Sequence, residues 1–495
     1  MTKFSYVAGD WVATAGESAD SLMPTALKYA RRVGLPALTR LTFHDRARVL
    51  LRLAERLDSN RDGVYRAATK VGATRRDATA DLEAAVGVLR GLGESALRDL
   101  PDATMVRDGP TTSSGPDGEL SSQRLYVSPR GIGFMLNTMG YFRWGSTARV
   151  TPAFMAGVPV IVKPADAATP VATELIRLFS QSRLAPPGSL QLVNGRVETF
   201  WDYLRLGDQV CFTGSAREGL KLSKQTKVAS GQVKLIVGTE NVNAAVLGPD
   251  EPPGSDGFEA LVACVARELT THAGQTGTAI RRVLVPRPRL KSFAKALCRR
   301  LDETAKVGDP GDPLTTVGPL FDHSHARNLG RQVRELVTFG GRIVRGGVKP
   351  RHLSGPYYEP TVLVFDQPTP VFCGVEPFGP VVSIAGYNSV AAAVRLANEG
   401  GSSLVITMAS HDHAFLREVA HGVAPYHARV RVLDPTASAG QAAGFETLAG
   451  GGRLRRPEEV AGVRAIYQWM HQVAIEGPAS AVAALVAEGT LAHSK

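Results

Sequence analysis

Apolar residues recur along this chain with two different periods. Over residues 44–57, valine and leucine return every three or four positions with polar or charged residues between them, which predicts an amphipathic helix. The same spacing recurs over 78–99 and 169–180. Between these segments lie short alternating or β-branched runs, which predict strands. The strands are expected at 124–131, 131–137, 159–164, 189–194 and 209–213.

This alternation of strands with helices predicts the fold class. Strands separated by helices of ten to fifteen residues form right-handed crossovers, so we expect an α/β protein with a doubly wound parallel sheet. Such sheets commonly bind nucleotides. Two stretches rich in proline and glycine interrupt the pattern. The stretch 101–122 is predicted to be a loop, and 249–257 to separate the first domain from a second α/β domain beginning at Phe258.

Composition adds the domain count and the class of partner. A chain of 495 residues is too long for one hydrophobic core, and its 44% apolar and 21% charged residues are ordinary for a globular protein. The formal net charge of +11 comes from basic residues scattered among acids, with no long block of like charge and few aromatic residues beside them. We therefore expect no nucleic-acid partner, but attraction to small anions such as nucleotides or CoA esters.

Cysteine spacing and hydropathy exclude further classes. The four cysteines have neither zinc-ligand spacing nor the density of a disulfide framework, so no metal site is predicted and each is expected to be a small buried residue. No apolar run approaches the ~20 residues that span a bilayer, and the first residues lack the apolar core of a signal peptide. We expect a cytoplasmic protein without a membrane partner.

Five motifs, in order and with matching spacings, resemble the aldehyde dehydrogenase superfamily. They are VKPA at 162–165, FTGS at 212–215, AGQTGTAIRR at 273–282, YEPT at 358–361 and EPFGP at 376–380. Any one of them alone would be weak, whereas five in order are specific. The third motif and GVRA at 462–465 are most similar to semialdehyde dehydrogenases that act on CoA esters in aromatic-ring degradation.

The resemblance implies an aldehyde-dehydrogenase-like domain organisation. A dinucleotide-binding domain would comprise 1–120 and 137–250, and a former catalytic domain, which carries the thiol in the family, would comprise 251–445. Residues 121–136 and 465–480 would form an oligomerisation arm, because the strand-like end of the chain resembles the strand that these proteins add to a neighbouring subunit. A homodimer or homotetramer is therefore expected.

The resemblance also implies a cofactor site. Backbone N–H groups at a turn that opens a helix hold phosphate, and FTGS has that form. Asp166 stands where the family often has a carboxylate on the ribose, and a carboxylate would repel a 2′-phosphate, so NAD is favoured over NADP. The expected cofactor-binding residues are Lys163, Asp166, Gly214, Ser215, Glu376 and Phe378.

The positions that carry catalysis in the family fall on glycines. Aldehyde oxidation needs a thiolate to attack the carbonyl, a donor for the oxyanion and a carboxylate base. The resemblance places the thiol at Gly277, the oxyanion asparagine at Gly140 and the glutamate at Gly238. We therefore expect a homologue that is redox-inactive, or repurposed for non-redox chemistry, and that binds a nucleotide or an acyl-thioester ligand.

Two alternatives stay open at this point. A local gap could move Glu240 to the position of the base or Asn137 to that of the oxyanion donor, although a two-residue shift along a strand displaces a side chain by ~7 Å. No neighbouring cysteine offers the same rescue for the thiol. The functional alternative is an NAD-dependent semialdehyde dehydrogenase of CoA-ester metabolism.

New polar groups near the old site could support other chemistry. His272 could act as an acid or base near neutral pH. Tyr141 could donate to an oxyanion, and Arg143 could pair with a carboxylate or phosphate. Each residue also has a structural explanation. The ring of His272 could be hydrogen-bonded to the backbone, Tyr141 could be a packed aromatic side chain, and Arg143 could form a surface ion pair.

Overall fold

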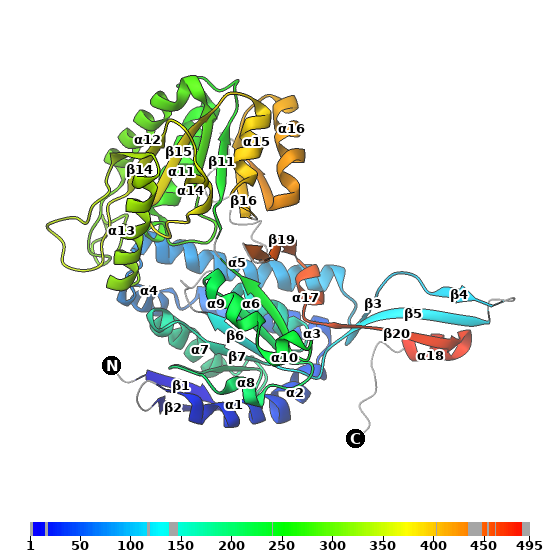
Figure 1. Cartoon of the computed structure of the whole chain (residues 1–495). Helices are drawn as coiled ribbons and strands as arrows, with labels where there is room; N and C mark the ends of the chain where they lie inside the picture. The colour runs from blue at the N-terminus through cyan, green and yellow to red at the C-terminus, as the bar shows by residue number, and fades with distance from the viewer. Residues whose placement is uncertain are drawn as a thin grey trace.

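Three sheets organise the chain (Figure 1), two of them forming the cores of α/β domains and the third a projecting arm. The structure is a computed structural model that describes residues 3–14, 18–115, 119–137, 147–239, 241–401, 403–433, 448–452, 455–460 and 462–487.

The first sheet has nine strands in the order β19-β18-β10-β9-β6-β7-β8-β1-β2. Strands β6 to β10 run parallel, as predicted, while β1 and β2 form an antiparallel edge and β19 lies antiparallel to β18. β6 and β9 are adjacent; β7 and β8 follow on the side of β6, and β10 follows on the side of β9. The bounds are β1 Lys3–Val7, β2 Asp10–Thr14, β6 Gly133–Asn137, β7 Val160–Lys163, β8 Leu190–Leu192, β9 Gln209–Thr213, β10 Lys234–Gly238, β18 Leu448–Gly452 and β19 Arg455–Val460.

Helices cover both faces of this sheet. Thr42 and Thr74 cap the N-termini of α3 and α5 by accepting backbone N–H bonds, which begins each helix where its apolar stripe begins. The predicted helices are confirmed as α3, α5 and α7, and their apolar faces share one core with β6, β7 and β8. Helices associated with this domain are α1 Met23–Tyr29, α2 Leu35–Thr39, α3 Phe43–Asp58, α4 Arg61–Lys70, α5 Arg75–Asp99, α6 Ala148–Met155, α7 Thr169–Ser182, α8 Phe200–Tyr203, α9 Ala216–Ser223, α10 Thr226–Ala229 and α17 Arg464–Tyr467.

The second sheet forms the core of another α/β unit, and its strand β11 lies before the predicted break at 249–257. Its seven strands lie in the order β13-β14-β15-β12-β11-β16-β17, with β13 antiparallel at one edge. Helices α11 and α12 pack on one face, and α13 to α16 on the other. The bounds are β11 Ala244–Leu247, β12 Arg282–Pro286, β13 Gly341–Arg345, β14 Thr361–Phe365, β15 Val381–Tyr387, β16 Ser403–Ala409, β17 His427–Val432, α11 Asp256–Thr270, α12 Leu290–Thr304, α13 His323–Thr338, α14 Pro370–Gly374, α15 Val390–Asn398 and α16 His413–Val423.

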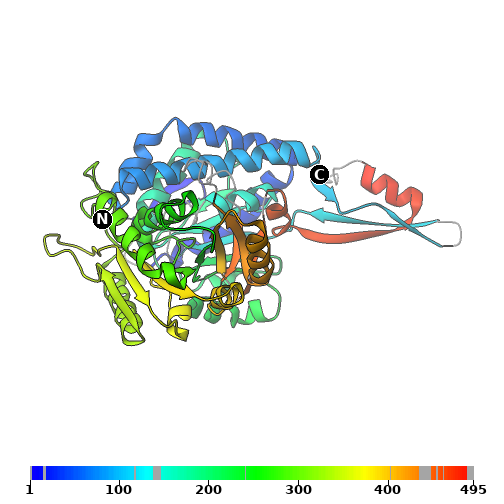
Figure 2. The same ribbon diagram turned by 90° about the horizontal axis from the view of Figure 1, so that it is seen from above.

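The third sheet projects from the body of the molecule as an arm (Figure 2). It pairs β5 with β20, β3 and β4, and α18 packs on it through Val482 and Val486. The arm thus joins segments from the two ends of the chain. Its elements are β3 Met105–Arg107, β4 Thr112–Ser114, β5 Leu120–Val127, β20 His471–Pro478 and α18 Ala479–Ala487.

The prediction of a loop over 101–122 was wrong in part, because β3, β4 and the start of β5 lie within it. Both β3 and β4 form by pairing with β5. Because such strands depend on a partner elsewhere in the chain, the local sequence predicts them poorly. Strands β3 and β4 consequently belong to the arm sheet, and not to the first domain, in which the sequence placed them. Among the described residues, no helix is long and apolar enough to cross a membrane.

Candidate functional site

The carboxyl ends of four parallel strands meet at one edge of the first sheet. Gly238 of β10 pairs with Thr213 of β9, which pairs in turn with Asn137 of β6, and β7 ends alongside at Lys163. The strand order reverses between β6 and β9. In open α/β sheets, ligands bind in the crevice at such a reversal, outside the carboxyl ends of the strands.

The FTGS turn lies at this reversal. The backbone N–H of Gly214 donates to the carbonyl of Gly238 at 3.0 Å, which fixes the turn to the neighbouring strand. The hydroxyl of Ser215 accepts from the N–H of Glu218 and caps α9. The positive end of the α9 dipole therefore faces the carboxyl edge of the sheet, where it favours a negatively charged group.

Lys163 and Asp166 lie at the same edge, on the other side of β6. Burial lowers the pKa of Lys163, and the nearby Asp166 carboxylate offsets this in part. The Asp166 carboxylate is mostly exposed and lies 2.9 Å from Nζ of Lys3. A lysine that is partly desolvated and close to a single exposed carboxylate can still bind a polar or anionic ligand.

Glu376 is buried, with 6% of its surface exposed, and holds two neighbouring segments. Its Oε2 accepts the backbone N–H of Asn241 at 2.7 Å, and its Oε1 lies 3.6 Å from Nε of Arg281. The Arg281 guanidinium lies 5.4 Å from the centre of the Phe378 ring. The ring of His325 packs edge-on against Phe378 and bonds its carbonyl at 2.6 Å.

The segment that carries Gly277 packs directly on these residues. Gly274 has a φ of +68°, and a Cβ there would lie 2.2 Å from the carbonyl oxygen of Gly379. Only glycine fits such a close approach at a positive φ. The amide of Asn243 donates to the carbonyls of Gly277 at 2.9 Å and Ala279 at 3.0 Å. The fold thus brings together two motifs that lie far apart in the sequence, 273–282 and 376–380, with the segment 241–243 that precedes β11.

Gly277 itself is under no such restriction. Its φ lies outside the left-handed region, and among the described residues a Cβ there would meet only Leu404 Cδ1, at 3.8 Å. That distance is ordinary van der Waals contact. The backbone and the packing therefore leave room for a side chain at position 277.

The space beside Gly238 is filled from another element. A Cβ on Gly238 would lie 2.5 Å from Nη2 of Arg149, which stands in the first turn of α6. Nη1 of Arg149 donates to Sγ of Cys211 at 3.0 Å. The sequence analysis missed Arg149, because no motif marks it and the contact joins α6 to β10.

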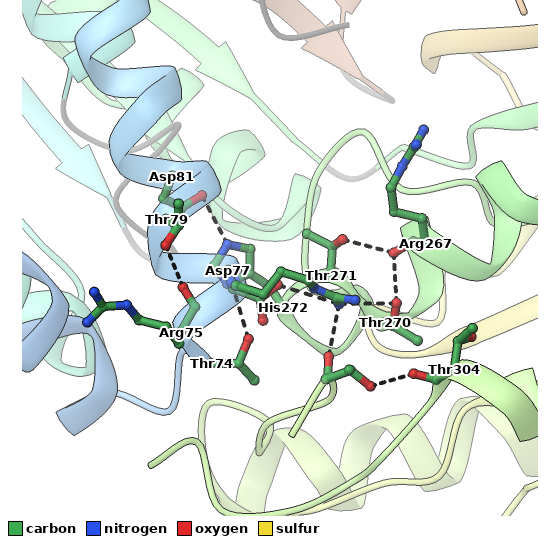
Figure 3. A network of polar contacts seen from close by, with 12 residues as sticks. Thr74, Arg75, Asp77, Thr79, Asp81, Arg267, Thr270, Thr271, His272 and Thr304 are labelled. Carbon is green, nitrogen blue, oxygen red and sulfur yellow. Dashed lines mark hydrogen bonds and ion pairs between the residues drawn. The ribbon is translucent and has the colours of Figure 1, made fainter. Parts of the chain in front are cut away.

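His272 lies on the loop before Gly277 and contacts the first domain. Its Nε2 is 3.0 Å from Oδ1 of Asp81 on α5, and both side chains are buried (Figure 3). His272 and Ala273 have φ values of 49° and 51°, so the backbone is left-handed at both positions. The Asp81 carboxylate thus positions His272 and joins the two domains. The sequence analysis missed Asp81 as well.

Three other predicted site residues, Gly140, Tyr141 and Arg143, lie outside the described residues. Within the described ranges, one group of side chains has the spacing of a metal site, namely Asp250, Glu251 and His411. Asp250 accepts the hydroxyl of Ser410 and the backbone N–H groups of His411 and Asp412, and Glu251 bonds Ser255 and the His411 ring. These bonds account for the group as a loop anchor.

Known proteins match this chain over most of its length. The model of the aldehyde dehydrogenase family matches residues 2–428. The chain is 30% identical to 3,4-dehydroadipyl-CoA semialdehyde dehydrogenase of Aromatoleum evansii, and the match covers 92% of this chain and 94% of that protein. It is also 30% identical to N-succinylglutamate 5-semialdehyde dehydrogenase of Escherichia coli O157:H7, over 77% of this chain and 75% of the relative.

Solved structures share the fold at low sequence identity. Betaine aldehyde dehydrogenase of Staphylococcus aureus in complex with NAD+ superposes with a TM-score of 0.81 at 20% identity, covering 97% of this chain and 95% of that one. Lactaldehyde dehydrogenase of Escherichia coli gives a TM-score of 0.81 at 18% identity, covering 96% and 99%. The α/β fold predicted from the sequence is confirmed, and the chain belongs to the aldehyde dehydrogenase family.

Proposed function

We propose that this protein binds NAD and an acyl-type ligand in the cleft between its domains but does not oxidise aldehydes through a thiol at position 277. It would then be a redox-inactive or repurposed member of its family. The single observation that carries the proposal is residue 277, a glycine at the end of the Ala-Gly-Gln-Thr segment in which the family resemblance implies a cysteine.

The environment of position 277 supports this proposal. The backbone there does not require glycine and the space accommodates a side chain, so the fold does not explain the residue. Burial raises the pKa values of Cys264 and Cys373 to about 11, which keeps both thiols protonated near neutral pH. A protonated thiol is a poor nucleophile. Cys211 is buried against Arg149, and Cys298 lies on α12.

The residues at the edge of the first sheet fit a dinucleotide. Lys163 and Gly214 lie on opposite sides of β6, so they are separated by about two strand spacings, or ~10 Å. The N-terminus of α9 would receive phosphate, and Lys163 and Asp166 would contact a ribose. Glu376 and Phe378 would contact the nicotinamide end, provided that Glu376 leaves its bonds to Asn241 and Arg281. The exposed Asp166 carboxylate favours NAD over NADP.

A second candidate is an NAD-dependent semialdehyde dehydrogenase of CoA-ester metabolism. The relatives favour it over the first proposal, because the proteins reported above are named dehydrogenases and one matches nearly the whole chain. In this second candidate, His272 would be the general acid or base, and the buried carboxylate of Asp81 would orient its imidazole. Residue 277 is the observation against it.

Two measurements separate the candidates. Calorimetry with NAD, NADP and acyl-CoA esters tests the cleft, and we expect NAD and a CoA ester to bind. Absorbance of NADH with a panel of CoA-linked semialdehydes tests oxidation, and we expect none from the natural chain. Aldehyde-dependent NADH formation would overturn the proposal and establish the second candidate. Substituting His272 by alanine then shows whether any observed chemistry depends on that imidazole.

Restoring the implied catalytic groups gives a complementary test. Gly277→Cys should add a thiol without disturbing the fold, and Gly277→Ser is its matched control. The triple substitution Gly277→Cys, Gly238→Glu and Gly140→Asn, made together with Arg149→Ala to free the space beside position 238, should yield measurable NADH formation, because the cofactor cradle is otherwise intact in this proposal. NAD binding by calorimetry confirms that each variant keeps its cleft.

We further propose that the arm assembles the chain into a homodimer or homotetramer. We also propose that the domain division given above holds, except that β3 and β4 belong to the arm, β6 to the first domain and β11 to the second. β20 pairs with β5 along one side and lies at the end of the strand order, so its outer edge is available to another strand. Sedimentation equilibrium tests this assembly. A mass of two or four chains is expected, and a monomer at micromolar concentration would contradict the proposal. A cytoplasmic location, without a nucleic-acid or membrane partner, remains a prediction.

A further inference from the structure

We propose that Arg149 makes the floor of the cleft a binding site for a carboxylate, so that the ligand held there is an acid and not an aldehyde. The inference deepens the proposed function and rests on it, because it assigns a substrate class to the same cleft.

The Arg149 guanidinium occupies the space next to the carboxyl end of β10. Its Nη2 lies 2.5 Å from where a Cβ on Gly238 would stand, and its Nη1 lies 3.0 Å from Sγ of Cys211 on the neighbouring strand. A residue at position 238 with a long side chain would compete with Arg149 for this space. The glycine therefore allows a cation to stand at the edge of the sheet.

Arg149 has donors to spare. A guanidinium carries five N–H donors, and among the described residues its acceptor is the thiol of Cys211, which is weak. No described carboxylate lies within ion-pair distance of Arg149, and its side chain is half-buried. A partly desolvated cation gains from a counter-charge, and an anionic ligand would supply one.

The surrounding charges favour an anion over a neutral carbonyl. Gly238, which lies beside Arg149, contributes no charge, and the carboxylate of Glu376 is held by Arg281 and the N–H of Asn241. A carboxylate presents two oxygens in a plane, which match the paired N–H groups of a guanidinium. An aldehyde offers one neutral oxygen and gains much less from the same group.

Calorimetry with a matched pair of small probes tests the proposal. Hexanoate and hexanamide have the same chain and differ in charge at the head group. We expect the natural protein to bind hexanoate at least tenfold more tightly than hexanamide at low salt. Hexanoate that fails to bind, or that binds no better than the amide, would overturn the proposal.

Variants at position 149 locate the site. Arg149→Gln should weaken hexanoate binding about ten- to hundredfold, as expected for one hydrogen-bonded charge pair, and leave hexanamide unchanged. Arg149→Lys keeps the charge and should lose only part of the affinity. Arg300→Gln, an exposed arginine on α12, is the control and should bind hexanoate normally. Equal affinity in the Arg149→Gln and natural proteins would contradict the assignment.

A substitution at position 238 tests the same site independently. Gly238→Glu brings a carboxylate to Arg149 and should weaken hexanoate binding to the level of Arg149→Gln, whereas Gly238→Gln, which is similar in size and neutral, should weaken it less. Melting temperature and NAD affinity show that each variant is folded. The proposed function is tested by a separate assay. It fails if the natural chain forms NADH from aldehydes, and that assay contains no hexanoate.

Discussion

Two glycines three residues apart in the same loop have opposite relations to the fold. Gly274 has a left-handed backbone and stands against the carbonyl of Gly379, where a Cβ would lie 2.2 Å from the oxygen. Gly277 has neither restriction within the described part of the chain, where a Cβ would meet only a leucine methyl at 3.8 Å. Packing requires glycine at position 274, whereas the described structure does not require glycine at position 277.

This contrast separates the residues that hold the loop in its conformation from the residue that would react with a substrate. Gly274, the Asp81–His272 pair and the Asn243 amide hold the backbone against two neighbouring segments. These interactions fix the backbone at position 277, so a side chain substituted there would have a defined position. The shape of this loop therefore does not depend on which residue occupies position 277.

The largest effect is expected for Gly274→Ala. The new Cβ would strain a left-handed backbone and overlap with a carbonyl, so we expect a loss of roughly 4 kcal/mol or more in the free energy of unfolding. Thermal and urea denaturation measure it. A loss below about 1 kcal/mol would mean that the loop does not need the close approach to Gly379.

Asp81→Ala should have the next largest effect. It leaves the buried His272 without its carboxylate, and breaking a buried pair costs ~3 kcal/mol. The double variant with His272→Ala should cost less than the sum of the two single variants, which a double-mutant cycle in urea would reveal. Glu83→Ala, at an exposed position of α5, is the control, and strict additivity of Asp81 and His272 would show that the pair contributes nothing.

Acid should destabilise the second domain through His427. Burial, assisted by the charge of Arg282, lowers the pKa of this histidine from 6.5 to about 4, so it stays neutral in the folded chain while the unfolded chain binds a proton below pH 6.5. Its contribution to stability is complete above pH 6.5 and is lost as the pH falls toward 4. Between pH 7 and pH 5 we expect a loss of about 2 kcal/mol.

Urea denaturation at the two pH values measures this loss. The variant His427→Gln cannot take up the proton, so its stability should depend less on pH than that of the natural chain over the same interval. Identical pH dependence in both proteins would mean that His427 is protonated in the folded state or is not the group that titrates.

Gly277→Ala should have the smallest effect. The added methyl meets no atom closer than 3.8 Å, and replacing glycine reduces the entropy of the unfolded chain, so stability should change by less than about 1 kcal/mol. The comparison with Gly274→Ala is then direct, since the same chemical change is made three residues apart. A loss similar to that of Gly274→Ala would show that glycine at 277 is structural.

Much of the first domain could be read from the sequence, because its main helices are strongly periodic and alternate with β-branched runs. The helix predicted over 78–99 is part of α5, and the strand predicted over 209–213 is β9. Interpretation of 101–122 as a loop failed, since β3 and β4 exist only by pairing with β5. The local sequence there is rich in glycine and proline and gives no periodic signal.

The sequence by itself determined the α/β architecture and the residue types at each motif. Periodic burial and turn chemistry are local properties, so they are written in neighbouring residues. Only the tertiary structure decided which side chains meet. It placed Arg149 beside Gly238, Asp81 against His272 and Arg281 against Glu376, because each contact joins segments that come together only when the chain packs.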